Sequence, residues 1–486
     1  KPLGSSFHAV KQTLLGNQMV FVGSLHRVLV VIRFLVAATT VPSHDHHTSI
    51  GGSEHTHPQP QQLLKMGHDL LPHFALSSNY TNLNHGSFGA TPRMVLEAQR
   101  DWQLHVESNP DHWFRARDAK SLVSAVATVR SRLARYIGAS NPDDLVLVDG
   151  ASGGVNAVLR SLRLPAAASL LLLNTAYPMV KNTAQYVHDY NGWGKPLEVN
   201  ITIPSSPSDI VQAVESALDS NPSVAVASFS HITSLPAVIL PVQELTRACH
   251  KRGVMVLVDG AHALGQIQIR VEEIGADFYV ADGHKWLYSP KGSALLWVAP
   301  GRQALIHPNV INYEGQGPTP FQLQFSYTGT KDYTALLAMS AALDFREQLG
   351  GDARIMTYMH RLASYGGDLL AKAWGTKKLV ADDQIAAMVN VWLPSKAMAC
   401  CSLDLSNHIL LLNQTWVPVS PWDGGCLVRV SAQVYNEISD FARFGEALSK
   451  VLAGDWCSDG RNSSGYSSIS SSTDNGTHAS LQLLHS

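Results

Sequence analysis

The chain has few cysteines and few charged residues. Its 486 residues include five cysteines, an odd number, and no two of them form a CxxC pair. This pattern argues against a disulfide scaffold and against a structural zinc site. Charged residues make up 15% of the chain and the formal net charge is −2, so no field of one sign would attract nucleic acid. The sequence therefore predicts neither a metal nor a nucleic-acid partner.

The chain also lacks a long apolar run without charge, and its first part lacks acidic residues. Residues 27–41, "RVLVVIRFLVAATTV", are apolar but carry Arg33 in their middle, whereas a spanning helix needs about 20 apolar residues with few or no charges. No acidic residue precedes Asp45, and basic, apolar, acid-poor segments are typical of targeting sequences. We therefore expect no stable membrane span. Residues 1–62 are predicted to be a targeting-like segment and a His/Pro-rich linker, with non-native translated sequence as the alternative.

Apolar runs alternate with helix-periodic segments from Leu63 onward. Continuous apolar runs of this length are typical of strands buried on both faces, and helices between them favour a doubly wound, largely parallel sheet. The predicted strands are 144–148, 169–174, 223–229, 254–258, 277–281 and 293–298.

The pattern of predicted elements changes after about residue 333. From there on, helical stretches and short strands predict a smaller α+β domain. The fold class is therefore α/β with a second domain. The predicted divisions are 63–332 for an N-terminal arm and the large domain, 333–455 for the small C-terminal domain, and 456–486 for a disordered tail rich in Ser, Gly and Asn.

Polar side chains follow several predicted strands, and ligands gather at the carboxyl ends of strands in such sheets. The turn "DGASGG" (149–154) precedes a predicted helix, and it is either an ordinary glycine turn or an anion site formed by the free N–H groups of that helix. Tyr177 follows the next strand and is either rim packing or a ring platform. Asp259 ends the strand "VMVLV" and either caps a helix or contacts a ligand, with His262 facing the same crevice.

The stretch "ADGHKWLYSPKG" (281–292) places Asp282, His284 and Lys285 after another strand. Taken alone it is a solvated turn. Together with an anion site, an aromatic platform and a carboxylate, its lysine completes a set that suits pyridoxal phosphate. The phosphate needs the helix N-terminus, the ring needs a stacking partner, the ring nitrogen needs a carboxylate, and the aldehyde needs a lysine for a Schiff base.

These residues also carry a resemblance to a known family. "VDGAHALGQ", followed 26 residues after its aspartate by the lysine of "DGHKW", resembles the class V aminotransferase-like pyridoxal-phosphate enzymes. The motifs "LNHGSFGATP", "SHITS", "YTGTKDYTALLA" and "VRVSAQVYNEISD" look like the branch that contains isopenicillin N epimerase-like proteins, L-cysteine desulfhydrases and hercynylcysteine sulfoxide lyases. The resemblance covers roughly residues 65–450 and implies a fold-type I transferase architecture.

The resemblance implies a cofactor role for matching positions. Lys285 would carry the Schiff base and move the Cα proton, Asp259 would pair with the ring nitrogen, and His262 would lie near the phenolic oxygen of the ring. The remaining cofactor-binding positions are Tyr177 for stacking on the ring and Ser152, Gly153, Asp282 and His284 around the phosphate.

The resemblance also implies substrate and partner contacts. Arg429 would bind the substrate carboxylate through a bidentate fork, and Asn84 and His85 would line the substrate side. Thr330 would reach the phosphate of a neighbouring subunit, because these enzymes are similar in forming homodimers with shared sites.

The sequence departs from the family pattern at three positions, namely Gly150, Ser230 and Asp282. An ionised Asp282 would repel a phosphate dianion. We therefore expect its carboxyl group to be protonated, turned away, or offset by a cation.

The implied reaction is β-elimination by a C–S lyase on L-cysteine or a cysteine-derived thioether or sulfoxide. Epimerisation or transamination by the same fold is the first alternative, and a non-catalytic binding protein is the second. Cys426, Cys400 and Cys401 do not match the loop pattern of desulfurases, so inert thiols are expected there. The few cysteines and the cofactor favour a reducing compartment, either the cytoplasm or an organelle such as a plastid or mitochondrion.

Overall fold

The computed structural model describes residues 63–312, 317–454 and 457. The predicted targeting-like segment and the predicted tail lie outside these residues, except for Cys457. The predicted domain boundaries stay predictions. No helix in the described ranges is long and apolar enough to cross a membrane.

A seven-stranded sheet forms the larger part of the fold, in the order β1-β7-β6-β5-β4-β2-β3. Only β7 runs antiparallel to its neighbours, and the other pairs in the sheet are parallel. The predicted α/β class with a mostly parallel sheet is therefore confirmed. The strands are β1 Leu145–Val148, β2 Ser169–Leu173, β3 Leu197–Val199, β4 Val224–Ser230, β5 Met255–Asp259, β6 Phe278–Asp282 and β7 Ala294–Val298.

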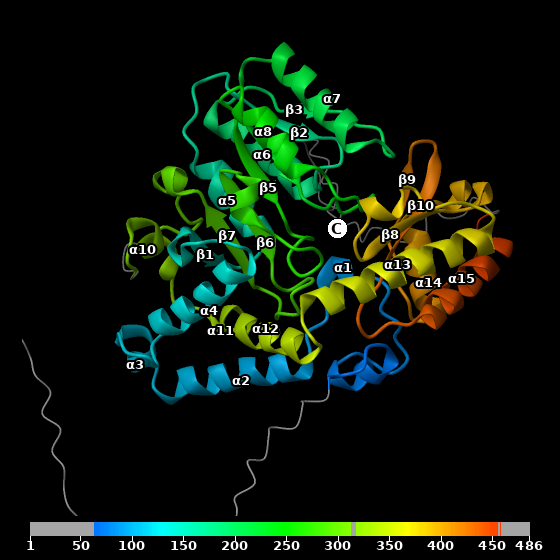
Figure 1. Cartoon of the computed structure of the whole chain (residues 1–486), viewed down its shortest axis with the longest axis horizontal. Helices are drawn as coiled ribbons and strands as arrows, with labels where there is room; N and C mark the ends of the chain where they lie inside the picture. Colours follow the sequence, from blue (N-terminus) through cyan, green and yellow to red (C-terminus); the bar gives the residue numbers. More distant parts are fainter. Residues whose placement is uncertain (1–62, 313–316, 455–456, 458–486) are drawn as a thin grey trace, which may run out of the picture. The chain divides into compact units, whose positions relative to one another are not determined.

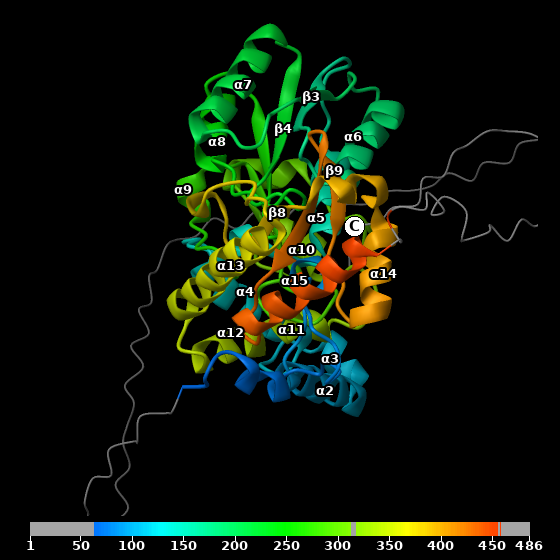
Figure 2. The same cartoon turned by 90° about the vertical axis from the view of Figure 1, so that its right-hand side faces the viewer.

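Side chains of β1, β2, β5, β6 and β7 alternate between two apolar cores, one on each face of the sheet. On β2, Leu171 and Leu173 belong to the core that includes α4 (Leu122–Tyr136), α7 (Pro207–Ser220) and α8 (Val242–His250). Leu170 and Leu172 belong to the core that includes α5 (Ala151–Ser161) and α6 (Pro178–Asn191). Figure 2 shows α7 and α8 on one side of β4 and α6 on the other. Burial on both faces explains why the strand sequences are continuously apolar.

A second sheet of three antiparallel strands has the order β8-β10-β9. It lies beside α13 and α15 in Figure 1. The α13 helix packs on α15 and on β8, and α14 packs on α15 and on β9. The elements are β8 Met388–Trp392, β9 Val419–Trp422, β10 Gly425–Ser431, α13 Asp352–Trp374, α14 Leu403–Asn413 and α15 Ile438–Ala453.

The remaining α-helices lie before β1, between β5 and β6, or between the two sheets in the sequence. They are α1 His85–Phe88, α2 Arg93–Ser108, α3 Pro110–Arg115, α9 Val271–Ile274, α10 Pro320–Ser326, α11 Thr334–Leu337 and α12 Met339–Gln348.

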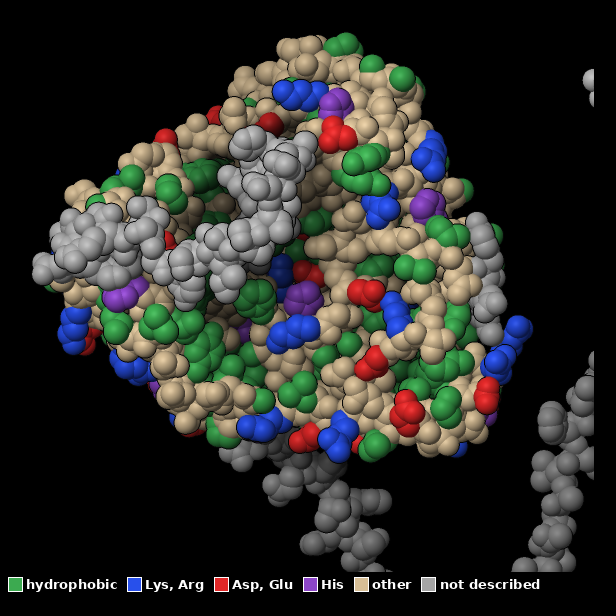
Figure 3. All heavy atoms as spheres, turned by 180° about the vertical axis from the view of Figure 1, so that it is seen from behind, with side chains coloured by type: hydrophobic (Ala, Val, Ile, Leu, Met, Phe, Trp, Pro, Cys, Tyr) green, Lys and Arg blue, Asp and Glu red, His purple; other side chains and the backbone are tan. Residues whose placement is uncertain are grey.

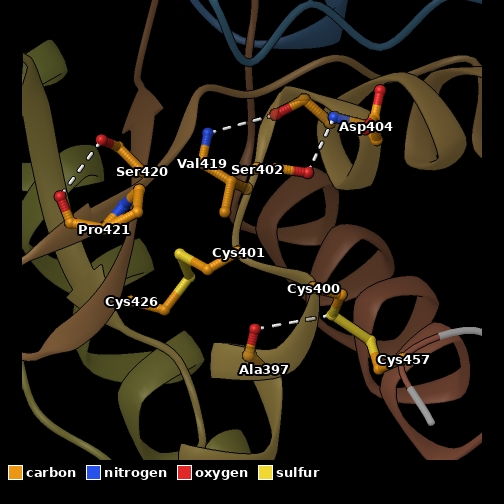
Figure 4. The surroundings of a disulfide bond; sticks show 11 residues. Ala397, Cys400, Cys401, Ser402, Asp404, Val419, Ser420, Pro421, Cys426 and Cys457 are labelled. Carbon is orange, nitrogen blue, oxygen red and sulfur yellow. Dashed lines mark hydrogen bonds between the residues drawn. A yellow bond between two sulfur atoms is a disulfide. The ribbon is translucent and has the colours of Figure 1, made fainter. Parts of the chain in front are cut away.

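Two disulfides link the region of the small sheet. Cys401 bonds Cys426 at the start of β10, and the adjacent Cys400 bonds Cys457 beyond α15 (Figure 4). The expectation of inert thiols at Cys400, Cys401 and Cys426 is wrong, because all three residues are paired in disulfides. The low and odd number of cysteines did not indicate these two bonds. Cysteine spacing along the chain does not reveal pairs because folding brings together residues 25 and 57 positions apart.

Removing the Cys401–Cys426 bond is expected to lower stability. The bond closes a loop of 25 residues, and cross-links of this length restrict the unfolded chain enough to contribute about 3 kcal/mol. We expect the double variant Cys401→Ser/Cys426→Ser to show this loss in the free energy of unfolding, measured in urea without reductant. An unchanged unfolding curve would mean that the bond does not form in solution. Cys249→Ser, at the buried unpaired cysteine, is the control for loss of a sulfur alone.

Candidate active site

A cavity of about 220 Å³ lies at the carboxyl ends of the parallel strands. Residues directly at or after the ends of β1, β2, β4, β5 and β6 line it. Figure 3 shows acidic, basic and histidine side chains lying together in a hollow near the middle of one face. The lining residues that end or follow a strand are Gly150, Ala151, Ser152, Tyr177, Ser230, Asp259, Asp282, His284 and Lys285.

Asp282 and Lys285 form an ion pair in this cavity. The Lys285 Nζ lies 3.2 Å from Asp282 Oδ2, and the Ala151 N–H at the start of α5 donates to Asp282 Oδ1 over 2.7 Å. The same Oδ1 lies 3.7 Å from His284 Nδ1. A cation and a helix N-terminus therefore offset the charge of Asp282. Of the three possibilities expected for this residue, the structure has the offset by a cation.

Asp259 is buried at the end of β5, with its side chain held by the backbone. The N–H of Ala261 donates to Asp259 Oδ1 over 3.0 Å. Burial raises the pKa of the Asp259 carboxyl, whereas this hydrogen bond and the charge of Lys285 act in the opposite direction. No cation lies within ion-pair distance of Asp259 in the described part of the chain. A carboxylate in this position favours a ligand that brings a positive charge or a proton.

His262 lies on the same wall of the cavity, three residues beyond Asp259. The Trp286 indole N–H donates to its Nδ1 over 3.4 Å. Burial holds the pKa of His262 well below its usual range, so the ring is neutral at pH 7. Because Nδ1 accepts a hydrogen bond, the neutral ring carries its proton on Nε2.

His85 supports the lysine turn from behind and is not among the cavity-lining residues. Its Nε2 lies 2.7 Å from the carbonyl oxygen of Lys285, and its Nδ1 lies 2.9 Å from the Tyr435 hydroxyl. A carbonyl only accepts, so Nε2 carries the proton and Tyr435 donates to Nδ1. Burial lowers the pKa of His85 to about 3. The neutral ring thereby links the backbone of Lys285 to the small-sheet region.

Gly89 allows the segment that carries His85 to approach this turn closely. Its φ is 68°, which is a conformation that favours glycine. A side chain at this position would overlap the carbonyl oxygen of His284. The glycine is therefore required both by the backbone conformation and by the close contact.

Arg429 is a buried guanidinium whose partners are all neutral. One terminal nitrogen donates to Asn84 Oδ1 (2.8 Å) and Ser87 Oγ (2.9 Å), and the other donates to the carbonyl oxygen (2.9 Å) and Oγ (3.2 Å) of Ser234. Burial lowers the pKa of Arg429 to about 10, so the group remains charged at pH 7. Its Nε has no acceptor within the described residues. A buried cation without an anion is costly, and this favours a site for an anionic ligand.

The other predicted residues divide between the cavity and its surroundings. Ser152 and Tyr177 line it. Gly153 and Thr330 line two other hollows, and Thr330 Oγ1 lies 2.7 Å from the Tyr327 hydroxyl. Asn84 is buried behind the cavity against Arg429.

Sequence reasoning did not single out several residues of this site. Ser87, Phe88 and Ser234 line the cavity, while Trp286 and Tyr435 position the two histidines. Ser87, Phe88 and Ser234 lie within motifs that carry the family resemblance, "LNHGSFGATP" and "SHITS". The family resemblance identified these two segments, but it did not identify which of their side chains line the cavity.

Curated proteins with similar sequences include enzymes of two kinds. A probable chloroplastic L-cysteine desulfhydrase of Arabidopsis thaliana is 31% identical over 407 residues, covering 77% of this chain and 83% of the relative. An isopenicillin N epimerase of Streptomyces clavuligerus is 30% identical over 393 residues, covering 77% and 95%.

The fold is similar to that of C-DES. The structure of this cystine C–S lyase with its product cysteine persulfide has a TM-score of 0.66 and 19% identity, covering 76% of this chain and 97% of that one. A second C-DES structure, of a variant, has glycine covalently linked to the PLP cofactor. The family described as Aminotransferase class-V matches residues 86–443. This chain therefore belongs to the class V aminotransferase family.

Proposed function

We propose that this chain is a pyridoxal-phosphate-dependent C–S lyase that acts on L-cysteine or on a cysteine-derived thioether or sulfoxide. The observation that carries the proposal is a cavity shared by an amine, Lys285, and a buried carboxylate, Asp259, at the carboxyl edge of the sheet. The buried Arg429 lies next to that cavity through Ser87 and Ser234. The desulfhydrase relative and the cystine lyase fold support the C–S lyase chemistry.

The residues present fit the cofactor. The first turn of α5 leaves the N–H groups of Ser152 and Gly153 free for a phosphate, as in any helix N-terminus. Asp259 would pair with the ring nitrogen, and Tyr177 would contact the ring. Lys285 would hold the aldehyde carbon covalently. When bound, the cofactor supplies an electron sink for the electron pair released at the substrate Cα.

The side chains then have distinct tasks. Arg429 would bind the substrate carboxylate and so orient the Cα–H bond. Lys285 Nζ would take the Cα proton, while Asp259 would keep a proton on the ring nitrogen. His262 would offer its Nε2–H to an oxygen of the ligand. Loss of the Cα proton and of the sulfur group at Cβ is an elimination, and with L-cysteine and water the products are sulfide, pyruvate and ammonia.

We also propose that this chain forms a homodimer with shared sites. Thr330 is exposed, away from the cavity of its own chain, and we propose that it contacts the phosphate bound by a partner subunit. Light scattering on purified protein is expected to give the mass of a dimer. A monomer that retains full activity would contradict this arrangement.

The epimerase relative supports a second candidate reaction, in which the Cα proton returns on the opposite face. The two reactions separate by product. Elimination releases sulfide and pyruvate, whereas epimerisation exchanges the Cα proton with solvent deuterium and leaves the sulfur in place. Transamination would yield a 2-oxo acid that keeps its sulfur.

The experiment that tests the proposal is an absorption spectrum before and after adding L-cysteine, with sulfide and pyruvate assayed in the same tube. A cofactor band with equal amounts of the two products is the expected result. A band without sulfide would exclude cysteine and direct the assay to sulfoxide conjugates and Cα exchange. No band after adding pyridoxal phosphate would contradict the proposal and favour a non-catalytic binding protein.

Arg429→Lys is expected to raise KM for L-cysteine by about a hundredfold, with a smaller change in kcat. Lysine keeps the charge but cannot form the planar fork, and its ammonium group cannot keep the contacts of Arg429 with Asn84, Ser87 and Ser234 together. Steady-state kinetics measure the change. Arg443→Lys, at an exposed arginine of α15, is the matched control and is expected to leave KM unchanged.

A further inference from the structure

Three asparagines of the described residues stand in N-x-Thr sequences. They are Asn79 in "NYT", Asn200 in "NIT" and Asn413 in "NQT". Such a sequence is the acceptor for N-linked glycans where the middle residue is not proline. Asn221 in "NPS", also among the described residues, is excluded because Pro222 occupies the middle position.

The side chains of these three asparagines are accessible and have no structural task. All three residues are exposed, and none of their side-chain amide groups has a hydrogen bond within the described part of the chain. Most other described asparagines do make side-chain hydrogen bonds. These are Asn82, Asn84, Asn109, Asn141, Asn156, Asn174, Asn221, Asn309, Asn390, Asn407 and Asn436.

The three positions lie in or beside surface loops, which is typical of glycan acceptors. Asn79 lies in a turn, Asn200 directly follows β3, and Asn413 is the last residue of α14. The first and third acceptor sequences are neighbours, since the Thr81 N–H donates to the Gln414 carbonyl over 3.1 Å. None of the three asparagines lines the cavity, so the modified side chains are not part of the candidate active site.

The cysteines independently indicate the environment in which the chain folds. Four of the five are paired in disulfides, and the fifth, Cys249, is buried with a pKa that burial raises to about 12. The folded chain thus offers no accessible thiolate among its described residues. Disulfides of this kind persist in oxidising compartments, and in a eukaryotic cell the secretory lumen both oxidises thiols and attaches N-linked glycans.

We infer that this protein matures in an oxidising, glycosylating compartment and carries N-linked glycans at Asn79, Asn200 and Asn413. At each site the asparagine Nδ2 loses one proton and bonds to the anomeric carbon of a lipid pyrophosphate-linked oligosaccharide, and the lipid pyrophosphate leaves. At each disulfide two thiols lose two protons and two electrons to a disulfide-bearing oxidoreductase, which becomes a dithiol. Sequence composition favoured a reducing compartment, and the disulfides and the exposed acceptors reverse that expectation.

The test is peptide mapping of the full protein isolated from the cells that make it. Peptide-N-glycosidase removes the glycan and converts the asparagine into aspartate. In water enriched in the heavy oxygen isotope, that aspartate carries the isotope as a mass label. We expect the label at Asn79, Asn200 and Asn413 and not at Asn182, which is equally exposed but is followed by Thr183-Ala184. Alkylation of the denatured protein without reductant is expected to modify Cys249 alone, with four more cysteines modified after reduction.

Label at fewer than two of the three asparagines, or alkylation of all five cysteines without reductant, would place maturation in a reducing compartment. Site assignment uses secreted full-length variants, in which Asn79→Gln removes one glycan and Thr81→Ser, which preserves the acceptor sequence, retains it. Catalytic activity is not a readout of either measurement, so failure here leaves the proposed lyase untouched.

Discussion

Lys285→Ala is expected to abolish sulfide release from L-cysteine, with a loss of about a thousandfold or more. The substitution removes the amine that would bind the cofactor covalently and also the base that would move the Cα proton, and proton transfer by a positioned group alone contributes a hundredfold or more. The variant should also lose the absorption band of the bound cofactor. Single-turnover assays with added pyridoxal phosphate, together with the spectrum, measure both effects.

Lys291→Ala is the matched control for this substitution. Lys291 belongs to the same loop, is exposed, and donates to the carbonyl oxygen of Gly89 over 3.2 Å. It does not line the cavity, and the variant should keep both the band and the activity. If Lys285→Ala keeps them as well, the amine of Lys285 has no role in the chemistry and the proposed function is wrong.

Asp259→Asn is expected to lower kcat by about a hundredfold to a thousandfold while the protein still binds the cofactor. The amide retains the shape of the side chain, and its oxygen can still accept from the Ala261 N–H. It has no negative charge to keep a proton on the ring nitrogen, and loss of one such electrostatic contact at a reacting centre typically has this magnitude. Stopped-flow spectroscopy with L-cysteine separates slow proton removal at Cα from weak cofactor binding.

Asp149→Asn is the comparison variant for Asp259. Asp149 also follows a strand, but it is exposed and pairs with Lys331 at 2.8 Å. We expect wild-type kcat from it. Wild-type activity in Asp259→Asn would mean that the charge at this position does not act on the cofactor ring, and the roles of Asp259 and Asp282 would have to be exchanged.

The architecture of the large sheet could be predicted because its strands are buried on both faces. Each of the six predicted apolar runs coincides with a strand to within a residue or two. The strand that was missed, β3, is three residues long, lies at the sheet edge and exposes Glu198. An edge strand packs on fewer neighbours, so its sequence need not be apolar and carries no periodic signal.

The pairing of charges in the site could not be predicted from the strand ends alone. The sequence places Asp259 and Asp282 at equivalent positions, each closing a strand before a turn. Only the fold shows that Lys285 pairs with Asp282, three residues away, and that α5 supplies an N–H to the same carboxylate. Likewise His85 was expected on the substrate side, yet its ring is buried behind the turn of Lys285.

The amino-acid sequence by itself determined the family, the class of fold, the position of the lysine and the segments that meet at the carboxyl edge of the sheet. These features depend on local composition and spacing, which folding does not alter. The tertiary structure decided which acid faces the lysine, which donors surround Arg429, which cysteines pair and which asparagines lack a partner. The donors around Arg429 and the paired cysteines are distant in sequence, and Lys285 meets Asp282 because the fold shapes the turn between them. Such contacts are set by how helices and sheets pack.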